Sequence, residues 1–269
     1  MSRYAQMVER LGGEREAALG AFLMLGDPDL GGSGRMLDAI VEGGADMVEV
    51  GIPFSDPVAD GPVIQAAASR ALKAGIRVSD CFDLLREFRR RHPAVPVGVL
   101  TYANIAVARG VERFFADSAA AGVDSILLAD VPALEAEPFA ERARAEGLDW
   151  VMIAAPNTPK PTLERIARLS SGYTYCVTRF GVTGARQELA LAHEALMAEL
   201  ESLEAPPPVF GFGISGSEQV AAAVAAGAKG VIVGSALVAL TTEADGERRI
   251  VEKVRSLKSA TRSLATQDR

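Results

Sequence analysis

Three carboxylates stand close together in one stretch of the chain, Met47–Gln65. Glu49 is the single charged residue of a short apolar run, and Asp56 and Asp60 follow it in a segment stiffened by prolines at positions 53, 57 and 62. The apolar run predicts a buried strand, which is a costly place for a carboxylate. A buried strand carboxylate followed closely by a rigid loop carboxylate indicates a paired acid and base.

An ordinary structural explanation is also open for each of these residues. Glu49 could be a core carboxylate neutralised by a neighbouring arginine, and Asp56 and Asp60 could be turn residues that accept backbone hydrogen bonds. Structural ion pairs perturb carboxylates just as catalytic sites do. The elements around the three residues must therefore decide between the two explanations.

The composition narrows the class of protein. The 269 residues, 49% of them hydrophobic, suffice for one large α/β core, and we expect a single domain over residues 1–269. A net charge of −7 argues against a nucleic-acid or anionic-membrane partner. The two cysteines are far apart and there are only two histidines, which argues against a metal site and favours a reduced, cytoplasmic protein. No signal-peptide or membrane-spanning run is expected.

Short apolar runs alternate with longer amphipathic ones along the whole chain. Glycines such as Gly43, Gly122 and Gly227 each end a helix-like stretch and precede an apolar run, which indicates a repeated βα unit. The expected strands are Leu19–Leu25, Met47–Gly51, Val95–Thr101, Ser125–Ala129, Trp150–Ala154, Tyr173–Val177, Val209–Phe212 and Gly230–Val233.

Eight such units in about 250 residues predict a closed (β/α)₈ barrel of the TIM type, with an extra N-terminal helix at Tyr4–Leu11. A doubly wound open sheet is the alternative, although no Gly-x-Gly-x-x-Gly follows the first strand. In a barrel, chemistry occurs at the carboxyl ends of the strands. Glu49 and Asp60 fall at that end, and so do Tyr102, Asn104, Asp130 and Tyr175.

Glycines also follow the last two expected strands, in Gly211–Ser215 and Gly234–Ser235. Backbone N–H groups at a helix N-terminus bind anions, and barrels often hold phosphate after strands seven and eight. The glycines could instead only make tight turns, but the presence of both at this place favours a phosphate ester as substrate. Ser215 and Glu218 have the spacing of a capping box for the following helix.

A third glycine-bearing loop, Arg179–Arg186, follows the sixth expected strand. It could be a lid that closes over bound phosphate and excludes water, or a solvated loop. Both explanations fit the pattern.

Taken together, seven stretches resemble the α-subunit of tryptophan synthase. They follow the order of that family across Tyr4–Ser263, and the first of them is the most specific. The resemblance implies a (β/α)₈ barrel that cleaves indole-3-glycerol phosphate to indole and glyceraldehyde 3-phosphate with no metal or organic cofactor. The stretches are Glu49–Pro62, Leu100–Asn104, Ala129–Pro132, Gly172–Tyr175, Gly181–Gly184, Gly211–Ser215 and Gly234–Ala236.

The resemblance also implies a role for individual residues. Glu49 would protonate indole C3 and then help to remove the glycerol hydroxyl proton, while Asp60 would stabilise the positive charge at the indole N–H. The apolar positions could equally be plain barrel core. The implied substrate-binding residues are Phe22, Ile64 and Leu100 around the indole, Tyr175 beside Glu49, Gly184, Gly213, Gly234 and Ser235 at the phosphate, and Thr183 reaching Asp60 from the lid.

A partner is implied as well, namely a pyridoxal-phosphate β-subunit in an αββα complex, to which indole passes directly. The proline-rich loop around Asp56 and the loop at Asn104 would contact it. Two alternatives remain, a regulatory phosphate-binding subunit with weak catalysis and a free-standing indole-releasing lyase; the intact Glu49 and Asp60 argue against the first. Ala21, Met24, Cys176 and Phe180 depart from the family pattern, which leaves the pocket wall there open.

Overall fold

The computed structural model describes residues 1–177 and 186–262, with only the backbone for residues 186–192. Nine parallel strands form one sheet in the order β5-β4-β3-β2-β1-β9-β8-β7-β6. The strands are β1 (Ala18–Met24), β2 (Met47–Gly51), β3 (Val97–Thr101), β4 (Ser125–Leu128), β5 (Asp149–Trp150), β6 (Ile153–Ala154), β7 (Thr174–Val177), β8 (Pro208–Gly211) and β9 (Gly230–Val233).

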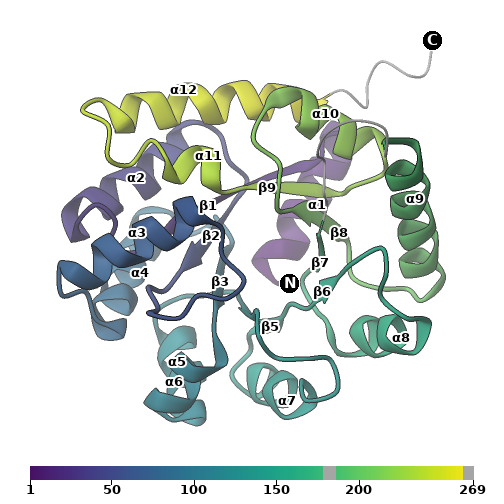
Figure 1. Cartoon of the computed structure of the whole chain (residues 1–269), viewed down its shortest axis with the longest axis horizontal. Helices are drawn as coiled ribbons and strands as arrows, with labels where there is room; N and C mark the ends of the chain where they lie inside the picture. Colours follow the sequence, from purple (N-terminus) through teal and green to yellow (C-terminus); the bar gives the residue numbers. More distant parts are fainter. Residues whose placement is uncertain (178–185, 263–269) are drawn as a thin grey trace.

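The helices surround these strands (Figure 1). In chain order they are α1 (Arg3–Glu14), α2 (Leu30–Glu42), α3 (Pro62–Lys73), α4 (Val78–Arg91), α5 (Ala103–Arg109), α6 (Val111–Ala120), α7 (Glu137–Ala145), α8 (Lys160–Leu169), α9 (Arg186–Ser202), α10 (Ser217–Ala225), α11 (Ser235–Val238) and α12 (Gly246–Ser259). In the part of the chain that the structure describes, none of them is long and apolar enough to cross a membrane.

The sheet closes on itself at the fifth βα unit. The sequence predicts one strand at Trp150–Ala154, but the structure divides it into β5, which pairs with β4, and β6, which pairs with β7. Between them, the N–H of Val151 donates to Ile126 O at 2.9 Å and Met152 O accepts from the N–H of Tyr175 at 3.0 Å. The interrupted fifth strand therefore bridges β4 and β7 and closes the barrel. The predicted barrel with an extra N-terminal helix is confirmed.

Helix α5 is absent from the sequence prediction, which placed a loop at Asn104. No local side chain caps this seven-residue helix. The N–H of its first residue, Ala103, instead donates to Asp130 Oδ1 at 2.7 Å, across 27 positions of sequence. A cap supplied by a distant loop leaves no signal in the local pattern.

Helix α1 covers the amino-terminal end of the barrel. The Tyr4 hydroxyl lies 2.9 Å from Ser125 Oγ, and its ring lies 5.3 Å from that of Tyr173 between centroids. Arg3 pairs with Asp124 at 2.7 Å. Chemistry is thereby left to the opposite end, where the βα loops project.

The register of the central strands sets the depth of the candidate acid. Glu49 of β2 pairs with Phe22 of β1 on one side and Gly98 of β3 on the other. A Cβ at Gly98 would lie 2.9 Å from Ser125 Oγ and 3.1 Å from the Tyr4 hydroxyl. Because Gly98 has no side chain, the hydroxyl groups of Tyr4 and Tyr173 have room in the barrel interior beside Glu49.

Candidate active site

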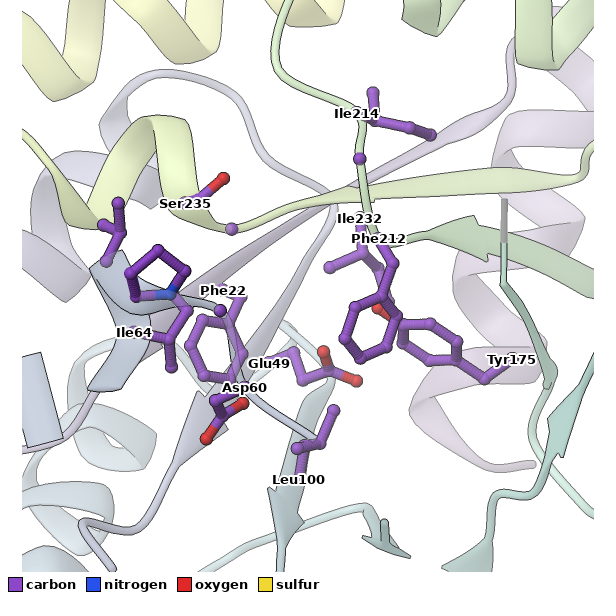
Figure 2. Close-up of a pocket in the computed structure, with 15 residues that line it drawn as sticks. Phe22, Glu49, Asp60, Ile64, Leu100, Tyr175, Phe212, Ile214, Ile232 and Ser235 are labelled. Carbon is purple, nitrogen blue, oxygen red and sulfur yellow. The ribbon is translucent and has the colours of Figure 1, made fainter. Parts of the chain in front are cut away.

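A cavity of about 390 Å³ opens among the βα loops, and Glu49 and Asp60 line it (Figure 2). It gathers side chains from both halves of the barrel, and it brings together nine of the residues that the sequence predicts for the site. The lining consists of Phe22, Glu49, Asp60, Gly61, Pro62, Val63, Ile64, Leu100, Tyr175, Phe212, Gly213, Ile214, Ile232, Gly234 and Ser235.

Glu49 lies at the base of this cavity and is only 2% exposed. The Tyr173 hydroxyl donates to Glu49 Oε1 at 3.0 Å, while Oε2 has no hydrogen-bond partner among the described residues. Burial raises the pKa of the carboxyl to about 8, and the Tyr173 hydrogen bond opposes that rise only in part. No cation among the described side chains contributes to the shift in pKa, so no described arginine neutralises Glu49 as a core residue. The raised pKa favours the neutral, proton-donating form of Glu49 near pH 7.

Asp60 faces the same cavity from the loop that leads into α3, and it is partly exposed. Burial raises its pKa, and a hydrogen bond from the Tyr102 hydroxyl lowers it. The same hydroxyl accepts the N–H of Ala59 at 3.2 Å, which fixes the loop beside Asp60. The two carboxyl groups therefore differ in kind, since one is deep and uncharged and the other lies nearer the surface.

Apolar side chains make flat walls between the two carboxyl groups. Phe22 and Ile64 lie on the Asp60 side, and Leu100 lies below them (Figure 2). On the other side, the rings of Tyr175 and Phe212 meet edge to face at 5.6 Å. Such a slot fits a planar aromatic ligand. Tyr175 lines the cavity as expected, but the hydrogen bond to Glu49 comes from Tyr173.

Gly213, Gly234 and Ser235 lie at the mouth of the cavity. No lysine or arginine is among the described lining residues, so an anion there would depend on backbone N–H groups and the Ser235 hydroxyl. The first backbone N–H groups of α11 have no partner within the helix and suit that role.

The start of α10 differs from the prediction. Gln219, not Glu218, caps this helix, because Gln219 Oε1 accepts from Ser215 N at 2.8 Å and from Gly216 N at 3.1 Å. The Ser215–Glu218 capping box is therefore wrong. Ser215, the last residue of the predicted anion-binding stretch, already uses its N–H group, which leaves Gly213 and the first turn of α11 as the candidate anion site.

The remaining predicted residues lie outside the cavity or outside the described chain. Asp56 is exposed in the loop after β2, and Asn104 is exposed in the first turn of α5. Neither Met24 nor Cys176 is among the described residues that line the cavity, and the same is true of Ala21. Thr183, Gly184 and Phe180, with the rest of the predicted lid loop at 178–185, lie outside the described residues.

Comparison with known proteins adds an independent finding. The family model described as tryptophan synthase alpha chain matches residues 8–266. A tryptophan synthase alpha chain from Shewanella amazonensis is 48% identical over 238 residues, which cover 88% of this chain and 90% of that one. The chain belongs to the tryptophan synthase alpha chain family.

Solved structures of the tryptophan synthase alpha chain family agree with the fold. The α-subunit from Legionella pneumophila superposes with a TM-score of 0.89 at 29% identity, covering 98% of this chain and 99% of that one. A chain of the tryptophan synthase complex from Pyrococcus furiosus gives a TM-score of 0.80 at 37% identity, covering 90% and 98%.

Sequence reasoning missed several residues that the structure places at the site. Tyr173 lies two positions before Tyr175, and strand alternation would have put both on the same face. Ile232 lies two positions before Gly234, so strand alternation would have put it on the same face as Gly234. Phe212 has a positive φ of 58°, and nothing in the pattern signals that its ring turns into the cavity.

Proposed function

We propose that the chain cleaves indole-3-glycerol phosphate to indole and glyceraldehyde 3-phosphate, the α reaction of tryptophan biosynthesis. One observation carries the proposal: a buried, neutral Glu49 lies at the base of an aromatic-walled cavity, with Oε2 unpartnered and Asp60 on the same cavity. Indole is an uncharged leaving group only if C3 is protonated, so the reaction requires an acid beside that carbon.

We assign the proton transfers to Glu49. Its carboxyl proton forms the new C3–H bond and places positive charge on the indole ring. The bond between C3 and the glycerol carbon then breaks, and the proton of the hydroxyl group on that carbon passes to the Glu49 carboxylate as the aldehyde forms. The cycle leaves Glu49 protonated again, so a pKa near 8 suits both steps. The Tyr173 hydrogen bond stabilises the carboxylate between them.

We assign charge stabilisation to Asp60. A carboxylate on the wall of a mostly apolar cavity stabilises a cationic ring more than it would in water, because the local dielectric is low. Phe22, Ile64 and Leu100 would hold the ring, while Gly213, Gly234 and Ser235 would hold the phosphate at the mouth. We keep Thr183 and Gly184 as proposed contacts from the loop after β7.

We propose that the chain works with a tryptophan synthase β-subunit in an αββα complex. Asp56 and Asn104 are exposed on the end of the barrel where the cavity opens. Three large apolar side chains are exposed on the loops and the helix that follow β2, β3 and β4, which is a mark of a protein interface. They are Val58 (83% exposed), Val107 (57%) and Leu134 (75%). We also propose a cytoplasmic location and a single domain.

The test is indole release from indole-3-glycerol phosphate by the purified chain, alone and with β-subunit added. Weak release that rises sharply with β supports both the lyase and the complex. Strong release that β leaves unchanged contradicts the complex and favours a free-standing lyase. No release in either case contradicts the lyase and favours a regulatory subunit.

A further inference from the structure

An ionic cluster is centred on the buried carboxylate of Asp27, and the catalytic scheme does not use it. Asp27 is 1% exposed and stands in the loop after β1. Arg70 of α3 donates to both carboxylate oxygens, from Nε to Oδ1 at 2.6 Å and from Nη2 to Oδ2 at 2.9 Å. The Thr241 hydroxyl, three residues beyond α11, donates to Oδ2 at 2.6 Å.

The cluster therefore ties three βα segments to one side chain. Each of the three segments also supplies part of the cavity wall: β1 carries Phe22, the first turn of α3 carries Ile64, and α11 begins at Gly234 and Ser235. Phe22 and Ile64 belong to the proposed indole pocket, and Gly234 and Ser235 belong to the proposed phosphate site. Asp27 thus links the segments that form the proposed indole pocket to the segment that forms the proposed phosphate site.

Helices α3 and α11 contact each other, but their packing leaves an opening. A groove of about 340 Å³ is open between them, lined by Val63 and Ala66 on one side and Val238 and Ala239 on the other. Arg70 lies along that groove with its side chain 38% exposed, and its guanidinium reaches inward to Asp27. A planar, two-point contact of this kind fixes orientation as well as distance.

The geometry of the cluster matters more than its energy. Desolvation of a buried ion pair offsets most of the attraction between its charges, so such a pair is weak evidence for a stabilising role. We infer that Asp27 is a positioning residue that sets the spacing between the indole pocket and the phosphate site through Arg70 and Thr241. The inference rests on the proposed function, since only a ligand with both an aromatic and a phosphate end senses that spacing.

The inference predicts that a change at Asp27 weakens binding of the whole substrate but not binding of indole or inorganic phosphate alone. Indole alone touches one wall and inorganic phosphate alone touches the other, so neither depends on the distance between them. Asp27→Asn, which keeps the shape but removes the charge, should raise KM for indole-3-glycerol phosphate about tenfold while kcat stays within about threefold. The affinities for indole and for inorganic phosphate should each stay within about twofold of the wild-type values.

Two further variants refine the test without removing the charge. Thr241→Val loses the hydroxyl and should raise KM about threefold, whereas Thr241→Ser keeps the donor and should restore the wild-type value. These variants carry the test if Asp27→Asn does not fold. Asp46→Asn is the matched control, because Asp46 is another buried carboxylate with cationic partners but lies at the opposite end of the barrel.

The measurements use the full chain in complex with β-subunit, together with the melting temperature of each variant. A melting temperature that falls in Asp27→Asn and Asp46→Asn alike, with KM unchanged in both, would reduce Asp27 to a structural residue. Equal KM values for Thr241→Ser and Thr241→Val, or fragment affinities that fall as far as that of the substrate, would also overturn the inference. Absence of turnover by the wild-type complex would instead contradict the proposed function, so the two failures are distinct.

Discussion

Two buried carboxyl groups, Asp46 and Glu49, lie three residues apart along the chain, and their surroundings are opposite in character. Asp46 immediately precedes β2 at the amino end of the barrel, and Glu49 is the middle residue of the strand. Asp46 accepts from Arg10 at 2.8 Å, from Lys258 at 2.7 Å and from the backbone N–H of Leu19 at 2.8 Å. Among the described residues, Glu49 accepts only from the Tyr173 hydroxyl.

The difference separates a structural carboxylate from the proposed proton donor. At Asp46, ion pairs with Arg10 and Lys258 attach α1 and α12 to the barrel. At Glu49, burial without a cation favours the protonated form. Burial alone therefore does not single out a candidate acid; Glu49 is singled out by burial without a compensating charge from a described side chain, beside an open cavity.

The largest expected effect comes from removing the proton of Glu49. Glu49→Gln is nearly isosteric, but its amide cannot protonate indole C3, so turnover should fall by about 10² or more. Affinity for the substrate should stay almost unchanged, because the cavity keeps its shape. Steady-state indole release and equilibrium binding measure the two quantities, and turnover retained in the variant would exclude Glu49 as the acid.

The matching change at Asp46 should lower the stability of the fold and leave turnover unchanged. Asp46→Asn leaves Arg10 and Lys258 without their shared partner, which should cost about 3 kcal/mol of unfolding free energy. Turnover per folded molecule should not change, because Asp46 is remote from the cavity. Urea denaturation gives the unfolding free energy. A loss of turnover in a fully folded Asp46→Asn sample would mean that Asp46 is coupled to the cavity.

The pH dependence of stability should distinguish the wild-type chain from Glu49→Gln. The pKa of Glu49 rises from 4.5 to about 8 on folding, so between these values the unfolded chain releases a proton that the folded chain keeps. The stability due to this group is therefore complete below pH 4.5 and is lost as the pH rises to about 8, by up to ~1.4 kcal/mol per pH unit.

Glu49→Gln does not titrate at this position and should gain stability relative to the wild-type chain across that interval. Urea midpoints at several pH values measure the difference. A difference that stays constant between pH 5 and pH 8 would mean that Glu49 is already ionised in the folded chain.

The smallest expected effect concerns the phosphate end. A Cβ at Gly234 would lie 3.5 Å from Phe22, which is ordinary van der Waals contact, so Gly234→Ala should fold normally. The methyl group would stand beside the proposed phosphate and should raise KM several-fold, by about 1 kcal/mol of lost binding, with kcat little changed. Gly213→Val should act in the same direction and more strongly, and its melting temperature must be compared with that of the wild-type chain because Gly213 has a positive φ of 83°, which strains a β-branched residue. Unchanged KM in both variants would move the phosphate site elsewhere.

Features that depend on local pattern could be predicted from the sequence. The apolar runs and glycine turns located all eight strand positions of the barrel, and the residue types in and after the second strand pointed to Glu49 and Asp60, which both line the cavity. Strand alternation and turn chemistry act over a few residues, so one sequence is enough to show them.

Features that depend on distant partners could not be predicted in this way. The partner of Glu49 is Tyr173, 124 positions away, and it comes into reach only when the barrel closes. Helix α5 depends on a cap from Asp130, and the interruption of the fifth strand depends on hydrogen bonds to Ile126 and Tyr175. In each case the deciding contact is a tertiary one.

The pH profile of indole release by the complex with β-subunit tests the central claim most directly. If the protonated Glu49 carboxyl is the acid, kcat/KM for indole-3-glycerol phosphate should fall tenfold per pH unit above pH about 8. On the acid side, kcat/KM should fall separately as Asp60 is protonated. The residual activity of Glu49→Gln should lack that alkaline decrease. An alkaline decrease that persists in the variant, or a wild-type profile that stays flat well above pH 8, would show that the proton comes from another group.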